Sequence, residues 1–122
     1  MDSRKTSPLG TSPQQQRLLA LDRANHIRIA RSTLKRRLHA GEITPAEAIL
    51  RGSRDTDTMT VSELLRSQRG WGPRRSAEAL RSVLLSDRKT LGSLTERQRV
   101  TLAAVLSAAI SKSRARRRQA DP

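Results

Sequence analysis

The chain has 122 residues and carries 25 lysine and arginine residues against 11 aspartate and glutamate residues, a formal net charge of +14. It has no cysteine and only two histidines, which excludes disulfide bonds and leaves no ligand set for a zinc site. No apolar run approaches the roughly 20 residues that cross a bilayer, and the first residues do not resemble a signal peptide. We therefore expect one small cytoplasmic domain without metal or cofactor, and a polyanionic partner. Nucleic acid is favoured over an anionic membrane.

The N-terminal third of the chain divides into a tail and a helix. Residues 1–13 combine Ser, Thr, Pro and Gly without periodicity, which predicts a disordered tail. Residues 14–40 are predicted to form a long basic amphipathic helix that ends at Gly41. Its apolar stripe contains Ile27, Ala30, Leu34 and Leu38. A basic stripe, rotated by about 100°, contains Arg28, Arg31, Lys35 and His39.

Three short motifs predict helix starts further along the chain. The segments "TPAE" (44–47), "TVSE" (60–63) and "TERQ" (95–98) each match a capping box and each begins an apolar-periodic stretch. Another helix is expected from Pro73, with Ala77, Leu80, Val83 and Leu84 on its buried face. The last helix is expected from Glu96 to about Ser111, and residues 112–122 are predicted to be a basic disordered tail.

No convincing alternation of apolar and polar residues predicts a strand. The predicted fold is therefore all-α, with about five helices. In it, one long N-terminal helix packs on a compact helical domain that spans residues 41–111.

The segment "RGWGPRR" (69–75) combines two glycines, a proline, three arginines and the only aromatic residue. It leads onto a helix N-terminus, where unpaired N–H groups and the helix dipole attract anions. Glycine carries no side chain and allows a phosphate to approach the backbone. The residues expected to hold this phosphate are Gly72, Arg74, Arg75 and Ser76.

Trp71 has two interpretations. Its ring either stacks on or wedges between bases, or it anchors the turn in a core that has no other aromatic residue. The second interpretation is favoured.

A second basic turn lies at residues 86–94. Arg88 and Lys89 are expected to reach a neighbouring phosphate. Arg97 and Arg99 lie near the start of the last helix, where cations oppose the helix dipole. This unfavourable placement suggests that an external anion compensates for it.

These segments resemble a known family. "GWGPRRSAEAL" (70–80) followed by "LTERQRVTL" (94–102) is similar to the helix–two-turns–helix motif, here at about residues 60–108, found in small-subunit ribosomal proteins and in DNA glycosylases of the formamidopyrimidine type. "RSTLKRRLHAGEITPAEAIL" (31–50) and "MTVSELLRS" (59–67) extend the resemblance to the actinobacterial integration host factor family over roughly residues 23–108. The chain departs from that family at Gln68 and Arg69 and at Trp71-Gly72-Pro73, as a divergent member would.

The resemblance implies a nucleoid-associated, architectural protein that contacts the duplex DNA backbone with low sequence specificity. It also implies DNA bending and assistance to a phage-type integrase. We expect a monomer with no small-molecule substrate and no catalytic activity, because no catalytic constellation is visible. The DNA-binding residues would be Gly72, Arg74, Arg75, Ser76, Arg88, Lys89 and Arg97, with Arg28, Arg31 and Lys35 holding an adjacent segment. The alternative is a protein that binds structured RNA or the ribosome through the same motif.

Overall fold

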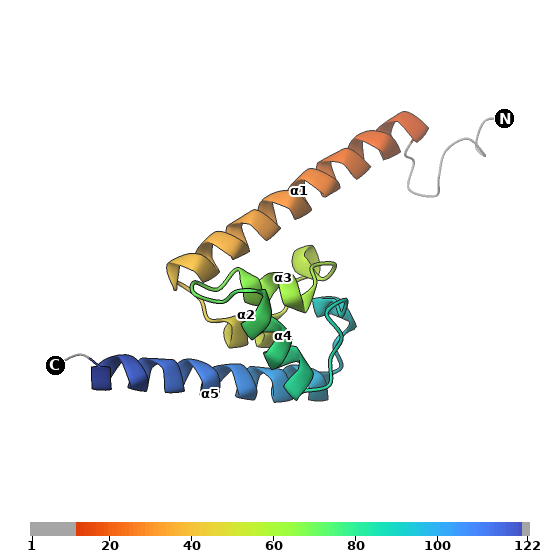
Figure 1. The fold of residues 1–122 in the computed structure, drawn as a ribbon. Helices are drawn as coiled ribbons and strands as arrows, with labels where there is room; N and C mark the ends of the chain where they lie inside the picture. The colour runs from red at the N-terminus through yellow and green to blue at the C-terminus, as the bar shows by residue number, and fades with distance from the viewer. Residues whose placement is uncertain (1–11, 121–122) are drawn as a thin grey trace.

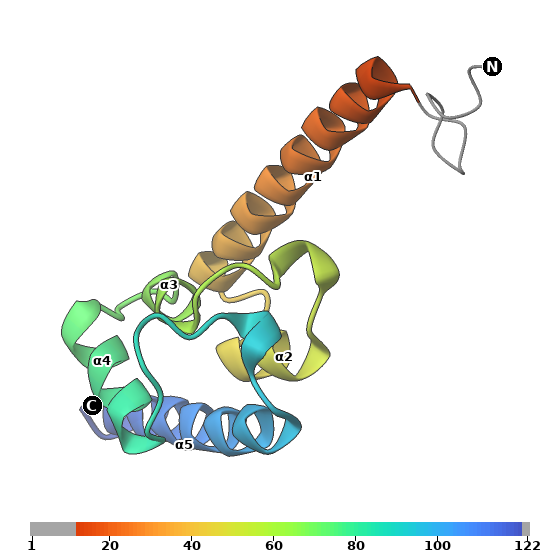
Figure 2. The same ribbon diagram turned by 90° about the vertical axis from the view of Figure 1, so that its right-hand side faces the viewer.

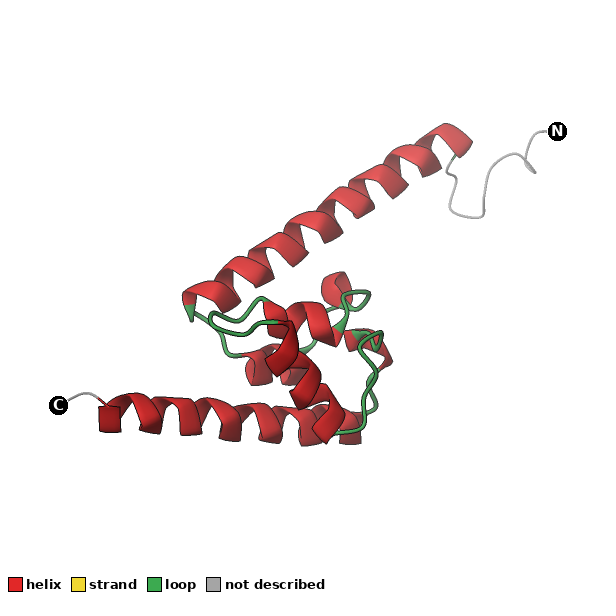
Figure 3. Ribbon diagram, viewed as in Figure 1, coloured by secondary structure: helices red, strands yellow, loops and turns green. Residues whose placement is uncertain are grey.

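The structure is a computed structural model that describes residues 12–120. It contains five α-helices and two short 3₁₀ helices, with no strand in the described part beyond one isolated bridge (Figure 3). The prediction of an all-α fold is confirmed. In chain order the elements are α1 (Pro13–Ala40), α2 (Pro45–Arg51), η2 (Arg54–Thr56), α3 (Val61–Arg66), α4 (Pro73–Ser82), η3 (Leu91–Ser93) and α5 (Glu96–Ala120).

Local capping signals determine where most helices begin. The hydroxyl oxygens of Thr44, Thr60 and Thr95 accept the backbone N–H of the residue three positions later, as the capping motifs predicted. At Thr95 the box is reciprocal, because the Thr95 N–H donates to the side chain of Gln98. Glu63 differs from the expected box. Its carboxylate turns away from the Thr60 N–H and binds α1 instead.

The core is almost purely aliphatic. α2 packs closely along α5, and α3 and α4 pack beside them, while η2 and η3 close the remaining side (Figure 2). The fully buried side chains include Leu38 from α1, Ile49 from α2, and Leu102 and Leu106 from α5. Burial of apolar surface of this kind contributes about 25 cal/mol per Å².

Only the C-terminal half of α1 belongs to this core. Leu34 and Leu38 pack against the compact body, whereas Leu18, Leu19 and Leu21 are 63%, 58% and 62% exposed. The N-terminal half of the helix therefore projects away from the rest of the molecule (Figure 1). The predicted packing of the long helix holds for its second half alone.

The loop between α4 and α5 is tied to the start of α3. Thr60 and Thr90 form the isolated bridge, in which the Val61 N–H donates to the Lys89 carbonyl at 2.8 Å. Gly92 is needed here, because a Cβ at this position would lie 2.8 Å from the Cβ of Asp57. This tether holds the second basic turn in place.

The structure differs from the predicted boundaries at both ends of the chain. α1 begins at Pro13 because Ser12 and Gln15 form a reciprocal capping box, a signal that the assignment of residues 1–13 to a tail overlooked. Residues 1–11 of the expected tail lie outside the described residues. α5 continues to Ala120, past the expected end at Ser111, because residues 112–120 contain no Gly or Pro and the cations favour a helix C-terminus. Thus the expected tail at 112–122 is helical as far as residue 120.

The expected buried face of α4 holds for Leu80, which is buried, and partly for Val83, which packs against the core, but not for Leu84. Leu84 is 93% exposed, and Leu85 is buried in its place. The reason is the helix C-terminus: Leu84 has φ of 59°, and the Leu85 N–H returns to the Leu80 carbonyl at 2.9 Å. Because Leu84 adopts this left-handed conformation, the side chain that returns to the core is that of Leu85, one residue later than the helical periodicity predicts.

Candidate nucleic-acid interface

The turn between α3 and α4 delivers the chain onto an uncapped helix start. Gly70 has φ of 81°, a conformation that glycine adopts without strain. Gly72 is the N-cap of α4, and as a glycine it offers no side chain to accept a hydrogen bond from this end. Pro73, at the first helical position, has no N–H of its own. Among the N-termini of α1 to α5, all described, the other four have a Ser or Thr cap.

Trp71 anchors this turn. Its side chain is 6% exposed and belongs to the aliphatic core. The guanidinium carbon of Arg75 lies 4.4 Å from the ring centroid, which is a cation–π contact. The favoured interpretation of Trp71 as an anchor is confirmed, and Arg75 is positioned by the ring.

Arg74 and Ser76 have opposite environments. The Arg74 side chain is 95% exposed, and its only ion pair among the described residues is with Glu78 at 3.7 Å. Ser76 is fully buried, and its hydroxyl donates to the Gly72 carbonyl at 3.0 Å. The expectation that the Ser76 hydroxyl binds a phosphate is therefore wrong, since the side chain is already paired within the first turn of α4.

The second turn is held by its own serine and by α3. The Ser86 oxygen accepts the Arg88 N–H at 3.0 Å, and the Lys89 carbonyl accepts from Val61. The side chain of Arg88 is exposed and that of Lys89 is partly buried. The first turn joins the end of α3, a helix of six residues, to the start of α4. The second turn follows the end of α4 and lies beside the start of α3 (Figure 2).

The two arginines at the start of α5 differ. Arg97 is exposed, as expected of a phosphate ligand. Arg99 is turned inward, where its guanidinium donates to the Ile49 carbonyl at 2.9 Å and to the Leu91 carbonyl at 2.7 Å. The inference of an external anion at Arg99 is wrong. This side chain joins the end of α2 to η3.

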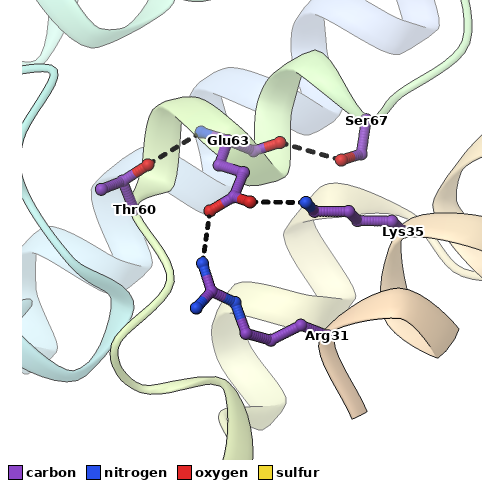
Figure 4. A network of polar contacts seen from close by, with 5 residues as sticks. All are labelled: Arg31, Lys35, Thr60, Glu63 and Ser67. Carbon is purple, nitrogen blue, oxygen red and sulfur yellow. Dashed lines mark hydrogen bonds and ion pairs between the residues drawn. The ribbon is translucent and has the colours of Figure 1, made fainter. Parts of the chain in front are cut away.

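The basic stripe of α1 is divided by Glu63. One carboxylate oxygen accepts from Arg31 at 2.8 Å and the other pairs with the Lys35 ammonium at 2.5 Å (Figure 4). These two side chains dock α1 on α3 and are not a freely solvated face. Arg28, one turn earlier, is exposed and has no ion pair within the described part of the chain.

Glu63 is held in its charged form by these contacts. Partial burial alone would raise the pKa of the carboxyl group. The hydrogen bonds and positive charges of Lys35 and Arg31 outweigh burial and lower the pKa of Glu63 below its ordinary value. The contact is therefore a charged clamp at neutral pH.

One basic residue near the start of α4 was missed. A surface hollow between α4 and α5 is lined by Gly72, Pro73, Arg74, Arg75, Glu78, Ala109 and Lys112. Lys112 lies in the segment that the sequence predicts to be a disordered tail, and such a tail has no fixed position for it. The signal was present in the sequence, because the helical pattern of α5 meets no Gly or Pro before residue 120.

Of the comparisons with known proteins, the one with solved structures identifies a protein of the same fold. No protein-family model matches the chain, and no curated protein matches it. A solved structure described as "Structure of sIHF bound to an 8bp palindromic DNA" superposes with a TM-score of 0.62 at 24% sequence identity, covering 70% of this chain and 98% of that chain. The chain has the sIHF fold. Within the described residues, no helix of this fold is long and apolar enough to cross a membrane.

Proposed function

We propose that the protein binds duplex DNA through backbone phosphates, with low sequence specificity, as an architectural component of the nucleoid. The observation that carries this proposal is the start of α4. There a helix end without a capping side chain lies beside the exposed Arg74 and the ring-positioned Arg75. Such an end combines unpaired N–H groups, the helix dipole and full positive charges. The likeness to sIHF, whose structure was solved on DNA, supports the same assignment.

The contact residues that we propose are a narrower set than the one expected from the sequence. Gly72, Arg74 and Arg75 share one site, to which Lys112 is added. Ser76 is removed from the set, and Arg31 and Lys35 are already paired with Glu63. The remaining proposed contacts are Arg88, Lys89 and Arg97, with Arg28 for an adjacent segment of DNA.

The chemistry of this surface favours a duplex over a single strand. The only aromatic ring is buried, so no platform for stacking unpaired bases is offered. Phosphate contacts position a protein on DNA without reading its sequence. A duplex held both at α4 and at Arg28 would be bent or bridged, which is the role we propose for a monomer that supports integrase-type recombination.

Competition between DNA and RNA tests this function against the structured-RNA alternative. The protein should shift a random-sequence duplex of about 20 base pairs in a gel, and an equal concentration of structured RNA should displace it poorly. Displacement of the duplex by equimolar RNA would favour the ribosomal or RNA-binding alternative, and the absence of any shift would overturn the proposal.

A matched pair of variants localises the site. Arg74→Ala should weaken binding to all duplex sequences alike, by up to about tenfold for one lost phosphate contact. Arg54→Ala removes one exposed positive charge from η2, away from α4, and should have little effect.

A further inference from the structure

A second cavity adjoins the start of α4 on its other side. Its volume is about 520 Å³, and three separate parts of the chain line it. These are the last turn of α1 with Gly41, the α3–α4 turn with Trp71 together with Arg75 of α4, and the C-terminal half of α5. Figure 1 shows the α3–α4 turn between the end of α1 and this half of α5.

The charged side chains that line the cavity are all positive. Arg69, Arg75 and Arg114 line it together with His39, and no aspartate or glutamate of the described residues does. The end of α1 contributes the negative pole of a helix dipole, equivalent to about half a unit charge. Three full positive charges outweigh this pole, so the cavity attracts anions.

Two of these arginines have exposed charges without a partner. Arg69 and Arg114 are exposed, and neither takes part in an ion pair or side-chain hydrogen bond within the described residues. They come from segments 45 residues apart, and only the continuation of α5 past residue 111 places Arg114 on this wall. No carboxylate among the described residues pairs with either of them.

The cavity and the proposed DNA site share one lining residue, Arg75. That residue lines both this cavity and the hollow that contains Gly72, Arg74 and Lys112. On α5, Lys112 borders the hollow and Arg114 borders the cavity, so the helix supplies one cation to each side of Arg75.

We propose that Arg69 and Arg114 bind a further backbone phosphate of the duplex held at the start of α4, in the cavity walled by Trp71. This inference rests on the proposed function and extends the DNA interface along α5. An arginine is suited to this role, because its planar fork donates two hydrogen bonds to one phosphate.

The test compares two double variants of equal charge. Arg69→Ala with Arg114→Ala removes the cavity pair, whereas Arg51→Ala with Arg54→Ala removes two exposed arginines from the α2–η2 region. Duplex affinity is measured by anisotropy of a labelled random 20-base-pair DNA over a salt series. The cavity variant should lose roughly tenfold or more in affinity, and its log–log salt slope should become shallower by about 0.9 for the lost phosphate. The control variant should lose less than about threefold, with the wild-type slope.

Trp71 supplies an independent readout, since it is the only aromatic residue and forms part of the cavity wall. Its emission should change when wild-type protein is saturated with duplex, and should change much less in the cavity variant at saturation. Circular dichroism of both variants checks that the fold is intact. Equal affinity loss in the two variants, or equal emission changes at saturation, would overturn the cavity assignment while leaving the proposed function standing. If the wild-type protein binds no duplex, both proposals fail together.

Discussion

The two glycines beside Trp71 have different requirements. Gly70 has φ of 81°, so any other residue there would be strained. Gly72 has φ of −89° and ψ of −176°, which is ordinary N-cap geometry, and nothing lies within 4 Å of a Cβ built on it. The fold itself therefore does not require glycine at position 72. A phosphate that approaches the backbone here, as proposed, would require it.

Gly72→Ser should separate stability from DNA binding. The serine hydroxyl would cap α4, so the free energy of unfolding should rise by a few tenths of a kcal/mol. The same hydroxyl would occupy the N–H groups and the space that the phosphate uses, so duplex affinity should fall. Urea denaturation and DNA titration measure the two effects. Unchanged or tighter DNA binding in this variant would show that the phosphate does not approach Gly72.

Leu84 is the only non-glycine residue with positive φ in the described chain, and its side chain is 93% exposed. The left-handed conformation costs a non-glycine residue about 1 kcal/mol, and the exposed side chain recovers none of it by burial. Leu84→Gly should therefore raise the free energy of unfolding by up to about 1 kcal/mol. Val83→Gly is the control: Val83 has φ of −110° and packs partly on the core, so this change should destabilise. Thermal denaturation of the two variants should shift in opposite directions, and a lower melting temperature for Leu84→Gly would refute the argument.

At the scale of elements, the Glu63 carboxylate helps to attach the long helix to the domain. Glu63 on α3 holds Arg31 and Lys35, which are four residues apart on one face of α1 (Figure 4). In this group the side chains of Glu63, Arg31 and Lys35 are 27%, 33% and 42% exposed. Its contribution therefore exceeds that of a fully exposed ion pair, but solvent screening keeps it modest.

This clamp should make stability depend on pH in one direction. Because the pKa of Glu63 is lowered in the folded protein, its contribution is fully present above the ordinary glutamate pKa. The contribution is lost as the pH falls through the lowered native value. Glu63→Gln should thus reduce the free energy of unfolding by about 1 kcal/mol near pH 7, and by much less near pH 3. Urea midpoints of both proteins across this range provide the measurement, and a difference that grows toward acid pH would contradict the clamp.

The elements themselves were largely predictable, because their signals are local. Thr44, Thr60 and Thr95 cap helices through bonds that span three residues. The predictions that the structure contradicts concern side chains with distant partners, or the ends of the chain. Arg31 and Glu63 are 32 residues apart in the sequence, and Arg99 and Ile49 are 50 residues apart. No local sequence pattern predicts contacts between residues so far apart.

The sequence predicts the residues of the candidate site that are neighbours in the chain, but not those that α5 contributes. Gly72, Arg74 and Arg75 are adjacent in sequence, so the turn that joins them was visible. Lys112 and Arg114 join them only through the packing of α5 beside α4, which depends on where α5 ends. Ser76 was lost from the prediction because burial of a hydroxyl at a helix start is decided by tertiary contacts.

At the scale of the whole molecule, the charge is distributed to suit a polyanion. Residues 41–65 hold five of the 11 acidic side chains, whereas the turns, the start of α4 and the second half of α5 are basic. A formal charge of +14 on 122 residues is unfavourable for a compact protein alone. Binding of DNA phosphates, as proposed, would relieve this repulsion and release counterions from the DNA.

The salt dependence of duplex binding tests this account most directly. The proposed contacts at α4, the second turn and α5 neutralise about five or more phosphates, and each contributes about −0.9 to the slope of log affinity against log salt. Titration of a random-sequence duplex from low to physiological ionic strength should therefore give a slope of about −4 or steeper. A slope shallower than about −1 would contradict a phosphate-dominated interface.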